Sequence, residues 1–279
     1  MSLSRIIRSL AAEAVSRWGL TMLRIYFMQQ WYALSGPGME DALLEIESMR
    51  RFAHLELSVD ALPDETTILN FRHLLEKYEL SKLMLQAINE SLQSRGCLLK
   101  GGTMVDATLI HASPSTKNRD KQRDPEMHQS KKGNQWFFGM KVHVGADAQS
   151  GLVHTVGVTP ANVADVSALP HLLREEDRAV FGDKGYVSNA LKRAARRAGV
   201  FWGVSLKARP KEPLSKAHKR FNRRMSSIRA RVEHVFRVMK CQFGYRKVRY
   251  TGIAKNAVQV FSLIGLANLY LARRKLLAA

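Results

Sequence analysis

From Thr103 onward, short β-branched segments alternate with amphipathic ones, and their order is the feature that most restricts the fold. Three predicted strands come first, and a turn at 146–151 joins the second to the third. After them helices and strands alternate. In order, the predicted elements are strands 103–110, 137–148 and 152–160, helix 162–174, strand 178–186, helix 189–198, strand 201–208 and the basic helix 217–240.

This order is that of an α/β fold with the ribonuclease-H-like topology, in which three antiparallel strands precede two parallel strands. We therefore expect a mixed five-stranded sheet with helices over residues 96–279. The first and fourth strands are neighbours in such a sheet. Many α/β folds begin with a similar order, so the side chains have to decide the function. The long, polar and basic segment 113–134 is predicted to be a loop.

Residues 1–95 have a different pattern, with apolar residues three or four positions apart, which is typical of amphipathic helices. Asp64 is a predicted N-cap, because it directly precedes one of these segments. The chain is thus predicted to carry an all-helical N-terminal domain, 1–95, and a catalytic domain, 96–279. The clearest helical segments are TMLRIYFMQQWYAL (21–34), MEDALLEIESMRRFAHL (39–55) and ETTILNFRHLLEKYEL (65–80).

The charge of the chain is strongly positive, at a formal +20 with a pI near 10.3. Most of the excess lies between residues 192 and 249, where 19 lysines and arginines accompany only two acidic residues. Such a run favours a polyanionic partner. Nucleic acid is the first candidate, because Lys and Arg neutralise its phosphate groups. An anionic membrane surface is the alternative.

Neither a membrane span nor a disulfide framework is expected. The most apolar segment, 257–271, contains Gln259 and Asn268 and is shorter than the roughly 20 residues that a span requires, so it is predicted to be a buried core helix. Cys97 and Cys241 are far apart and form no CxxC pair. This cysteine usage fits a reducing compartment such as the cytoplasm.

Three carboxylates stand at positions where a metal site is expected. Asp106 lies inside an apolar strand, Asp183 ends the neighbouring strand, and Glu233 is the only acidic residue after position 212. Carboxylates that converge in this way are the ligands that Mg²⁺ uses in two-metal phosphoryl transfer. Each has a plainer interpretation: a core ion pair for Asp106, a turn for Asp183, and an intrahelical ion pair of Glu233 with Arg229 or Arg237.

The residues around these carboxylates resemble those of bacterial insertion-sequence DDE transposases, in particular the IS-five family. A related group carries a Tyr-x-x-Arg-x-x-x-Glu-x(6)-Lys pattern on its last helix. Arg229, Glu233 and Lys240 match this pattern in register, whereas Ser226 replaces the tyrosine. The resemblance rests on VDATLI (105–110), DPEMHQSKKGNQWFFGMKVHVGAD (124–147), GDKGY (182–186) and RARVEHVFRVMK (229–240).

The resemblance implies a transposase that cuts DNA at terminal inverted repeats and transfers the strands to target DNA. It implies Mg²⁺, with Mn²⁺ as a substitute, bound by Asp106, Asp183 and Glu233. It also implies self-association on DNA and a place in the bacterial cytoplasm with the nucleoid. Two alternatives remain: a catalytically silent, domesticated DNA-binding derivative that acts as a repressor, and a nuclease without strand transfer.

Five residues are predicted to contact DNA. Arg229 and Lys240 are expected on phosphates with Arg237 beside them, and a solvated basic face is the plainer alternative. Trp136 is expected to stack on an extruded base, unless it is a core aromatic. Arg72 lies on a predicted recognition helix, 65–77, which could instead pack against the catalytic domain.

The first 20 residues depart from the family pattern. Relatives usually carry a Gly-Arg-Pro-Pro stretch before the helix that starts near Thr21, and MSLSRIIRSLAAEAVSRWGL stands there in this chain. This segment is basic and amphipathic, and it is expected to form a surface helix rather than a transit peptide. Its departure from the pattern predicts weak discrimination of terminal repeats.

Overall fold

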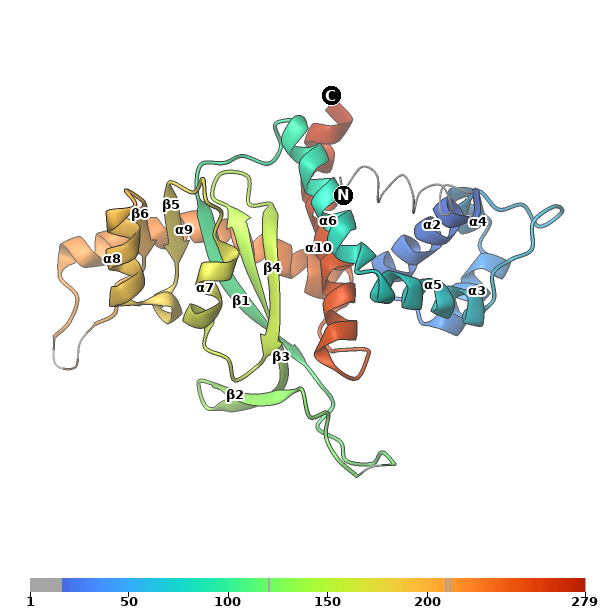
Figure 1. Cartoon of the computed structure of the whole chain (residues 1–279), viewed down its shortest axis with the longest axis horizontal. Helices are drawn as coiled ribbons and strands as arrows, with labels where there is room; N and C mark the ends of the chain where they lie inside the picture. The colour runs from blue at the N-terminus through green and yellow to red at the C-terminus, as the bar shows by residue number, and fades with distance from the viewer. Residues whose placement is uncertain (1–16, 120, 209, 211, 279) are drawn as a thin grey trace. The chain divides into compact units, whose positions relative to one another are not determined.

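The structure, a computed structural model, describes residues 17–119, 121–208, 210 and 212–278 (Figure 1). It divides between Ser81 and Lys82 into two compact units. Most of the predicted N-terminal segment, 1–20, lies outside the described residues, and its last four residues belong to a helix.

The second unit is built on a mixed sheet of six strands in the order β2-β3-β1-β5-β6, with β4 also paired to β3. The antiparallel pairs are β1–β3, β3–β4 and β2–β3, and the parallel pairs are β1–β5 and β5–β6. The predicted α/β fold with three antiparallel strands before two parallel ones is therefore confirmed. The strands are β1 (Thr103–His111), β2 (His128–Lys132), β3 (Gln135–Asp147), β4 (Val153–Pro160), β5 (Ala179–Gly182) and β6 (Phe201–Val204).

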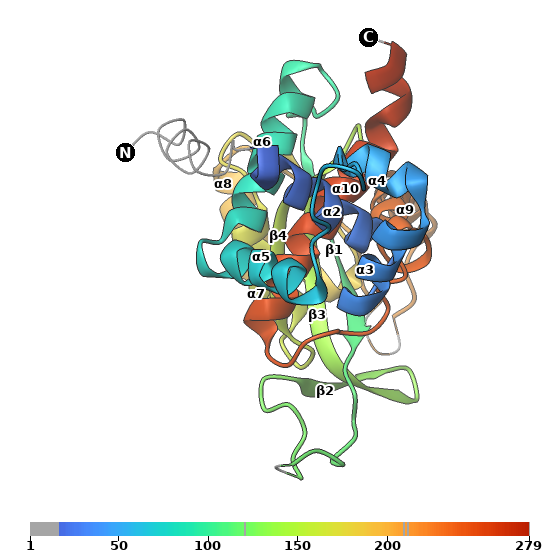
Figure 2. The same cartoon turned by 90° about the vertical axis from the view of Figure 1, so that its right-hand side faces the viewer.

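The predicted number of five strands is wrong, because β2 lies inside the segment that was expected to be a loop. Its sequence, HQSKK, has no apolar side chain to bury, and four of its five residues are exposed. Backbone pairing with residues 135–139 of β3 holds it instead. The hairpin of β2 and the start of β3 extends beyond the rest of the sheet (Figure 2).

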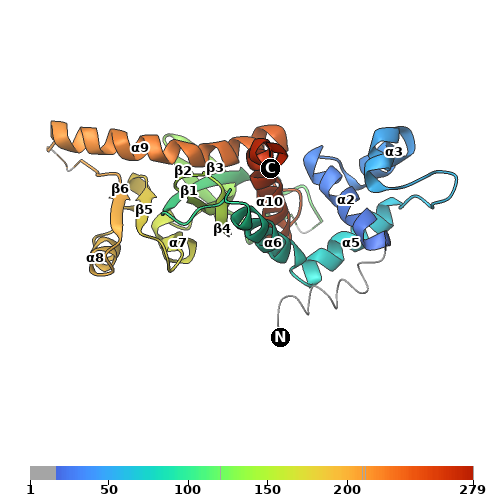
Figure 3. The same cartoon turned by 90° about the horizontal axis from the view of Figure 1, so that it is seen from above.

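Helices cover both faces of this sheet (Figure 3). One face packs against α7, and α9 crosses the other face over β1 and β5. On the α7 face, Val105 of β1, Val180 of β5 and Leu169 of α7 share a buried cluster. Burying each such side chain contributes roughly 1.5–3 kcal/mol. The elements are α7 (Asp165–Leu172), the 3₁₀ turn η1 (Lys184–Tyr186), α8 (Asn189–Arg197), α9 (Lys216–Arg237), the π-helical turn η2 (Val238–Gln242) and α10 (Ile253–Ala278).

The long helix α10 is the predicted core helix, and a polar side chain fixes it to the sheet. Asn268 is fully buried, accepts a hydrogen bond from the Val153 amide and donates to the Val153 carbonyl. It also donates to Asn89 of α6 (Leu80–Ser94). Nearly all of α6 therefore belongs to the second unit, whereas the predicted domain boundary placed it in the first. None of the described helices is long and apolar enough to cross a membrane.

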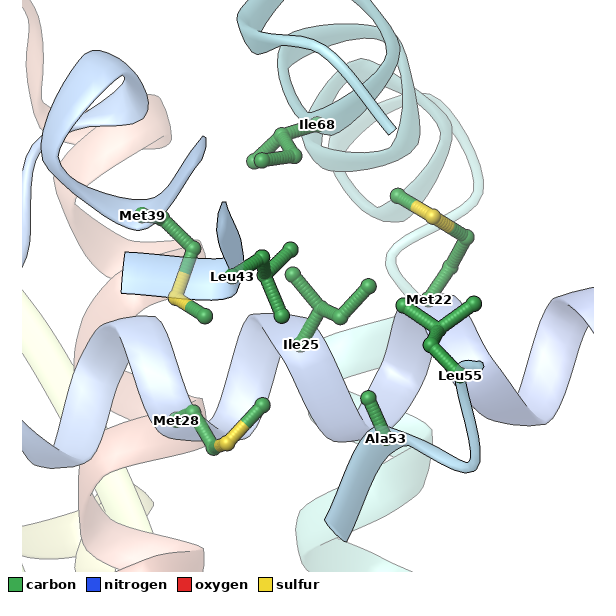
Figure 4. Close-up of a cluster of buried hydrophobic side chains, with 8 residues drawn as sticks. All are labelled: Met22, Ile25, Met28, Met39, Leu43, Ala53, Leu55 and Ile68. Carbon is green, nitrogen blue, oxygen red and sulfur yellow. The ribbon is translucent and has the colours of Figure 1, made fainter. Parts of the chain in front are cut away.

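The first unit is helical, as predicted, and has its own core (Figure 4). Asp64 caps α5, because its carboxylate accepts a hydrogen bond from the Thr67 amide at 2.7 Å. The helix predicted over 39–55 is interrupted at Ile46, which has an extended backbone. The helices are α2 (Arg17–Trp31), α3 (Gly36–Glu45), α4 (Glu47–Ala53) and α5 (Glu65–Lys77), and the core holds Met22, Ile25, Met28, Met39, Leu43, Ala53, Leu55 and Ile68.

His154 makes the stability of the second unit depend on pH. Burial, with the nearby Arg174 charge, lowers the pKa of His154 from 6.5 to about 3. The hydroxyl of Thr103 donates to Asp177, so its oxygen is left to accept from Nε2–H of His154. Nδ1 then accepts from the hydroxyl of Thr155. The ring is therefore held in its neutral form.

We expect the free energy of unfolding to fall as the pH drops from 6.5 towards 3, because the unfolded chain binds a proton on His154 that the folded chain refuses. Between pH 7 and 4.5 this loss is about 2–3 kcal/mol. Denaturant unfolding of wild type and His154→Asn at both pH values measures it. An equal drop in both proteins would show that His154 is not the group responsible.

Candidate active site

Asp106 lies on β1 and Asp183 directly follows β5, and both are at the same level of these two adjacent parallel strands. Thr103 of β1 pairs with Val180 of β5, and Met104 pairs with Phe181. Asp106 lies three residues after Thr103, and Asp183 lies three residues after Val180. The two aspartates therefore continue the register of this pair. The pairing ends before it reaches them. The two carboxylates therefore stand where the strands separate.

Asp106 points to the α9 face of the sheet. Side chains alternate along a strand, and Val105 packs on the α7 face. In agreement, Oδ2 of Asp106 accepts a hydrogen bond from Nη2 of Arg229 on α9 at 3.1 Å. The backbone N–H of Ala107 donates to the other carboxylate oxygen at 2.8 Å.

The environment of Asp106 disfavours its negative charge. Burial raises the pKa of the Asp106 carboxyl, and the Asp183 charge raises it further, although Arg229 and the Ala107 amide act in the opposite direction. Like charges that share a partly buried site are stabilised by a cation between them. The donor set thus fits a divalent metal ion with oxygen ligands.

The site has little room for a side chain at Gly185, in the Asp-Lys-Gly-Tyr sequence that follows β5. Asp183 is the N-cap of the 3₁₀ turn η1, and its Oδ1 accepts a hydrogen bond from the Gly185 amide at 2.7 Å. A Cβ at position 185 would lie 3.0 Å from that oxygen and 3.5 Å from a carboxylate oxygen of Asp165. The absence of a side chain at Gly185 therefore lets two carboxylates flank the turn.

Asp165 is a third carboxylate at this site, and the sequence did not single it out. It lies in the first turn of α7 and accepts a hydrogen bond from Nζ of Lys141 at 2.9 Å. The same ammonium group donates to the Val163 carbonyl at 2.8 Å. An acidic residue in the first helical turn is common for electrostatic reasons, so only the fold distinguishes Asp165.

Tyr186 places a buried hydroxyl among these carboxylates. The residue is fully buried, and its hydroxyl has no hydrogen-bond partner among the described residues. Burial raises the pKa of Tyr186, and the charges of Asp165, Asp106 and Asp183 raise it further. The hydroxyl is therefore protonated and able to donate a hydrogen bond to a bound group.

A Tyr186→Phe variant is expected to unfold with a free energy equal to wild type or about 1 kcal/mol higher when no ligand is bound, because an unpartnered buried hydroxyl costs stability. Thermal or denaturant unfolding in a chelator measures this. Tyr245→Phe is the matched control, since the Tyr245 hydroxyl bonds Asn256 at 3.3 Å and its loss should destabilise. A Tyr186→Phe protein destabilised as much as the control would mean that the Tyr186 hydroxyl is satisfied in solution.

Glu233 is exposed on α9, one helical turn after Arg229. Within the described residues it forms no ion pair, so the intrahelical pairing with Arg229 or Arg237 is not observed. Arg229 instead pairs with Asp106. No group of three or more His, Cys, Asp or Glu side chains in the described part is close enough to enclose a metal ion. Of the three predicted ligands, the structure therefore brings together Asp106 and Asp183.

The residues of α9 and η2 that are predicted to contact phosphate fall into two groups. Arg229 is directed at Asp106, and Lys240 donates from Nζ to the Leu109 carbonyl at 2.8 Å. Burial also lowers the pKa of Lys240, with Lys132 and Arg246 acting in the same direction. Arg237 is exposed in the last turn of α9. Lys240 lies in the π-helical turn η2, where the helical register departs from that of α9.

Trp136 is exposed to solvent, whereas the side chain of Arg72 is mostly buried. Trp136 is 63% exposed on the β2–β3 hairpin, with Nζ of Lys131 5.8 Å from its ring centroid, so it is not a core aromatic. Arg72 lies on α5, and its Nε is 3.1 Å from a carboxylate oxygen of Glu76. The Arg72 side chain is only 17% exposed. Its guanidinium is therefore less available to DNA than the sequence suggested.

Comparison with protein families agrees with this architecture. A family model described as "Transposase DDE domain" matches residues 99–269, a range that includes all six strands and α9. A second model, "Transposase domain (DUF772)", matches residues 19–74 in the helical first unit. The first match alone covers more than half of the chain. The chain therefore belongs to the DDE transposase family.

Proposed function

We propose that this protein is an insertion-sequence transposase of the IS-five type, which cleaves DNA at terminal inverted repeats and joins the freed 3′ ends to target DNA. The observation that carries the proposal is the placement of Asp106 and Asp183 at one level of two adjacent parallel strands, with Asp106 bonded to Arg229 of α9. Membership of the DDE transposase family supports it.

Asp106, Asp183 and Glu233 are the proposed ligands of the metal ions, Mg²⁺ or Mn²⁺. When bound, these ions activate the attacking oxygen and stabilise the leaving oxygen of an in-line phosphoryl transfer. Glu233 lies four residues after Arg229, which already reaches Asp106. Four residues advance a helix by about 6 Å and return to the same face, so the exposed Glu233 side chain is within reach of the site.

Arg229 has two proposed partners. Without a bound cation, its guanidinium balances the charge of Asp106, with both side chains mostly buried. With the carboxylates engaged elsewhere, the guanidinium becomes available to a DNA phosphate next to the bond that is cut. Tyr186 is proposed to donate a hydrogen bond from its hydroxyl to an oxygen held between the carboxylates.

The basic face of α9 is the proposed track for the DNA backbone. Its first half carries five exposed cations with no acidic residue among them. Arg237 extends this face, and Trp136 on the hairpin is a proposed stacking platform. Self-association on DNA is proposed because two element ends have to be held together. The cations of the first half are Lys216, Lys219, Arg220, Arg223 and Arg224.

A two-step DNA assay separates the proposed transposase from its rivals. We expect the protein to nick DNA with Mg²⁺ but not with EDTA, and to join a pre-cleaved repeat end with a free 3′-hydroxyl to a supercoiled plasmid. Nicking without joining would identify a nuclease without strand transfer. DNA binding without either reaction would identify a silent derivative. Scrambled duplexes in competition measure how well the repeat is discriminated.

A further inference from the structure

A second polar site lies beyond the end of β1, apart from the carboxylates. It is a cavity of about 720 Å³ between the described residues of the segment 112–125, which exclude residue 120, and the segment 247–251. This volume is in the range of pockets that bind small molecules or single groups of larger ligands. Ala112 lies six residues beyond Asp106, which corresponds to about 20 Å along an extended chain.

One wall of the cavity is held rigidly by the sheet and by a buried side chain. The Val248 amide donates to the His111 carbonyl at 2.8 Å. Asn256, which is fully buried, accepts hydrogen bonds from the amides of Arg249 and Tyr250. It also donates to the carbonyls of Tyr250 and Gly252. These bonds fix the path of 248–252.

The opposite wall is organised in the same way. Asn118 donates to the Gln122 carbonyl at 2.7 Å, and Arg123 donates from Nε to the Pro114 carbonyl at 3.0 Å. Asp124 connects the two walls, because its Oδ2 accepts a hydrogen bond from the Gly252 amide at 2.7 Å. The cavity is therefore formed before any ligand arrives, which reduces the entropy lost on binding.

The charge of the lining is strongly positive. Among the described residues, Lys117, Arg123, Lys247 and Arg249 line the cavity with a single acidic residue, Asp124, whose carboxylate is bonded to the opposite wall. Lys117 and Lys247 are exposed and form no ion pair among the described residues. Two exposed lysines without an ion pair in the lining of this polar cavity favour a phosphate-bearing ligand.

We propose that this cavity, the 112–125/247–251 pocket, binds a phosphodiester group of the DNA that flanks the cleaved bond. The phosphates of one strand advance about 3.4 Å each along the axis of a duplex, so 20 Å along that axis corresponds to roughly six nucleotides from the carboxylates. Lys117 and Lys247 hold the phosphate, and the half-buried Tyr250 ring offers a surface to the adjoining sugar or base. The choice of DNA as the ligand rests on the proposed function.

The test compares two double variants that remove the same charge. Lys117→Gln/Lys247→Gln changes the pocket, and Lys82→Gln/Lys275→Gln changes exposed lysines on α6 and α10. Fluorescence anisotropy with a labelled duplex is read over a series of salt concentrations. We expect the pocket variant to bind about tenfold more weakly and to lower the salt slope by about two, with less than a twofold loss in the control pair. Thermal unfolding confirms that both variants are folded.

Two outcomes overturn the assignment. Equal losses in the two double variants would reduce the pocket to ordinary surface charge. If inorganic phosphate raises the melting temperature of wild type but not of the pocket variant, while DNA affinity stays unchanged, the site binds a free anion instead. The proposed catalytic function is judged separately, because the binding assay contains EDTA and needs no cleavage. A protein that never nicks DNA can still show the pocket effect.

Discussion

Replacing Asp106 or Asp183 with asparagine, or Glu233 with glutamine, is expected to lower the rate of metal-dependent DNA cleavage by about 10³-fold or more, which corresponds to about 4 kcal/mol of activation free energy. The physical reason is the loss of an anionic oxygen ligand. DNA affinity should remain or increase, because each change removes a negative charge near phosphate. Nicking rates and anisotropy measured on the same preparations check both parts.

The control is Glu176→Gln, which removes an exposed carboxylate that pairs with Lys100 outside the site. It should cleave at the wild-type rate. Asp106→Asn should also fold normally, since burial already disfavours the Asp106 charge. Any one of the three site variants that retains near wild-type cleavage would remove that residue from the catalytic set.

The Asp106 carboxyl makes both the stability of the protein and the rate of DNA cleavage depend on pH. Its raised folded-state pKa means that Asp106 takes up a proton at a higher pH in the folded chain than in the unfolded chain. Protonation relieves the cost of burial, so its contribution to stability improves as the pH falls. Cleavage should decline over the same range, because a protonated carboxyl is a poor metal ligand.

DNA affinity is expected to fall by about 10³–10⁵ between 50 and 200 mM salt, if six to ten phosphates are neutralised. The exposed cations of α9 are the reason. Arg237→Ala should lower the slope of log K against log salt by about one and weaken binding to all sequences alike. The salt slope of Lys240→Ala is compared with that of Arg237→Ala, because Lys240 is half-buried and donates a hydrogen bond to the Leu109 carbonyl. A slope that is unchanged in Arg237→Ala would place this arginine outside the interface.

The fold was largely predictable because its strands and helices bury regular apolar patterns. The antiparallel pairing of β1, β3 and β4 and the parallel pairing of β1 with β5 were expected from the order of the elements. The β2 strand was missed because HQSKK is held by backbone pairing and has no apolar alternation. The predicted boundary at residue 95 lies after α6, whereas the two compact units divide between Ser81 and Lys82. The difference arises because α6 contacts the second unit through Asn89 and Asn268, residues that are far apart in the chain.

The candidate site was predictable only where a residue type was out of place in its element. Asp106 in an apolar strand and Asp183 at the end of a strand gave such a signal. Asp165 and Lys141 did not, because an acidic residue at a helix start and a lysine in a strand are both common. The prediction for Arg229 was also incomplete. Its place in the helix pattern with Glu233 and Lys240 indicated a phosphate contact, whereas in the structure its guanidinium donates to Asp106 on β1.

Iron-mediated backbone cleavage tests most directly whether the three proposed ligands form one metal centre. Fe²⁺ in place of Mg²⁺, with ascorbate and peroxide, produces hydroxyl radicals that cut the chain close to the bound ion, and mass spectrometry locates the cuts. We predict Mg²⁺-competable cuts in three segments, around Asp106, Asp183 and Glu233, all lost in Asp183→Asn. Cuts around Asp106 and Asp183 without any near Glu233, or cuts that Mg²⁺ does not suppress, would contradict this account of the catalytic centre.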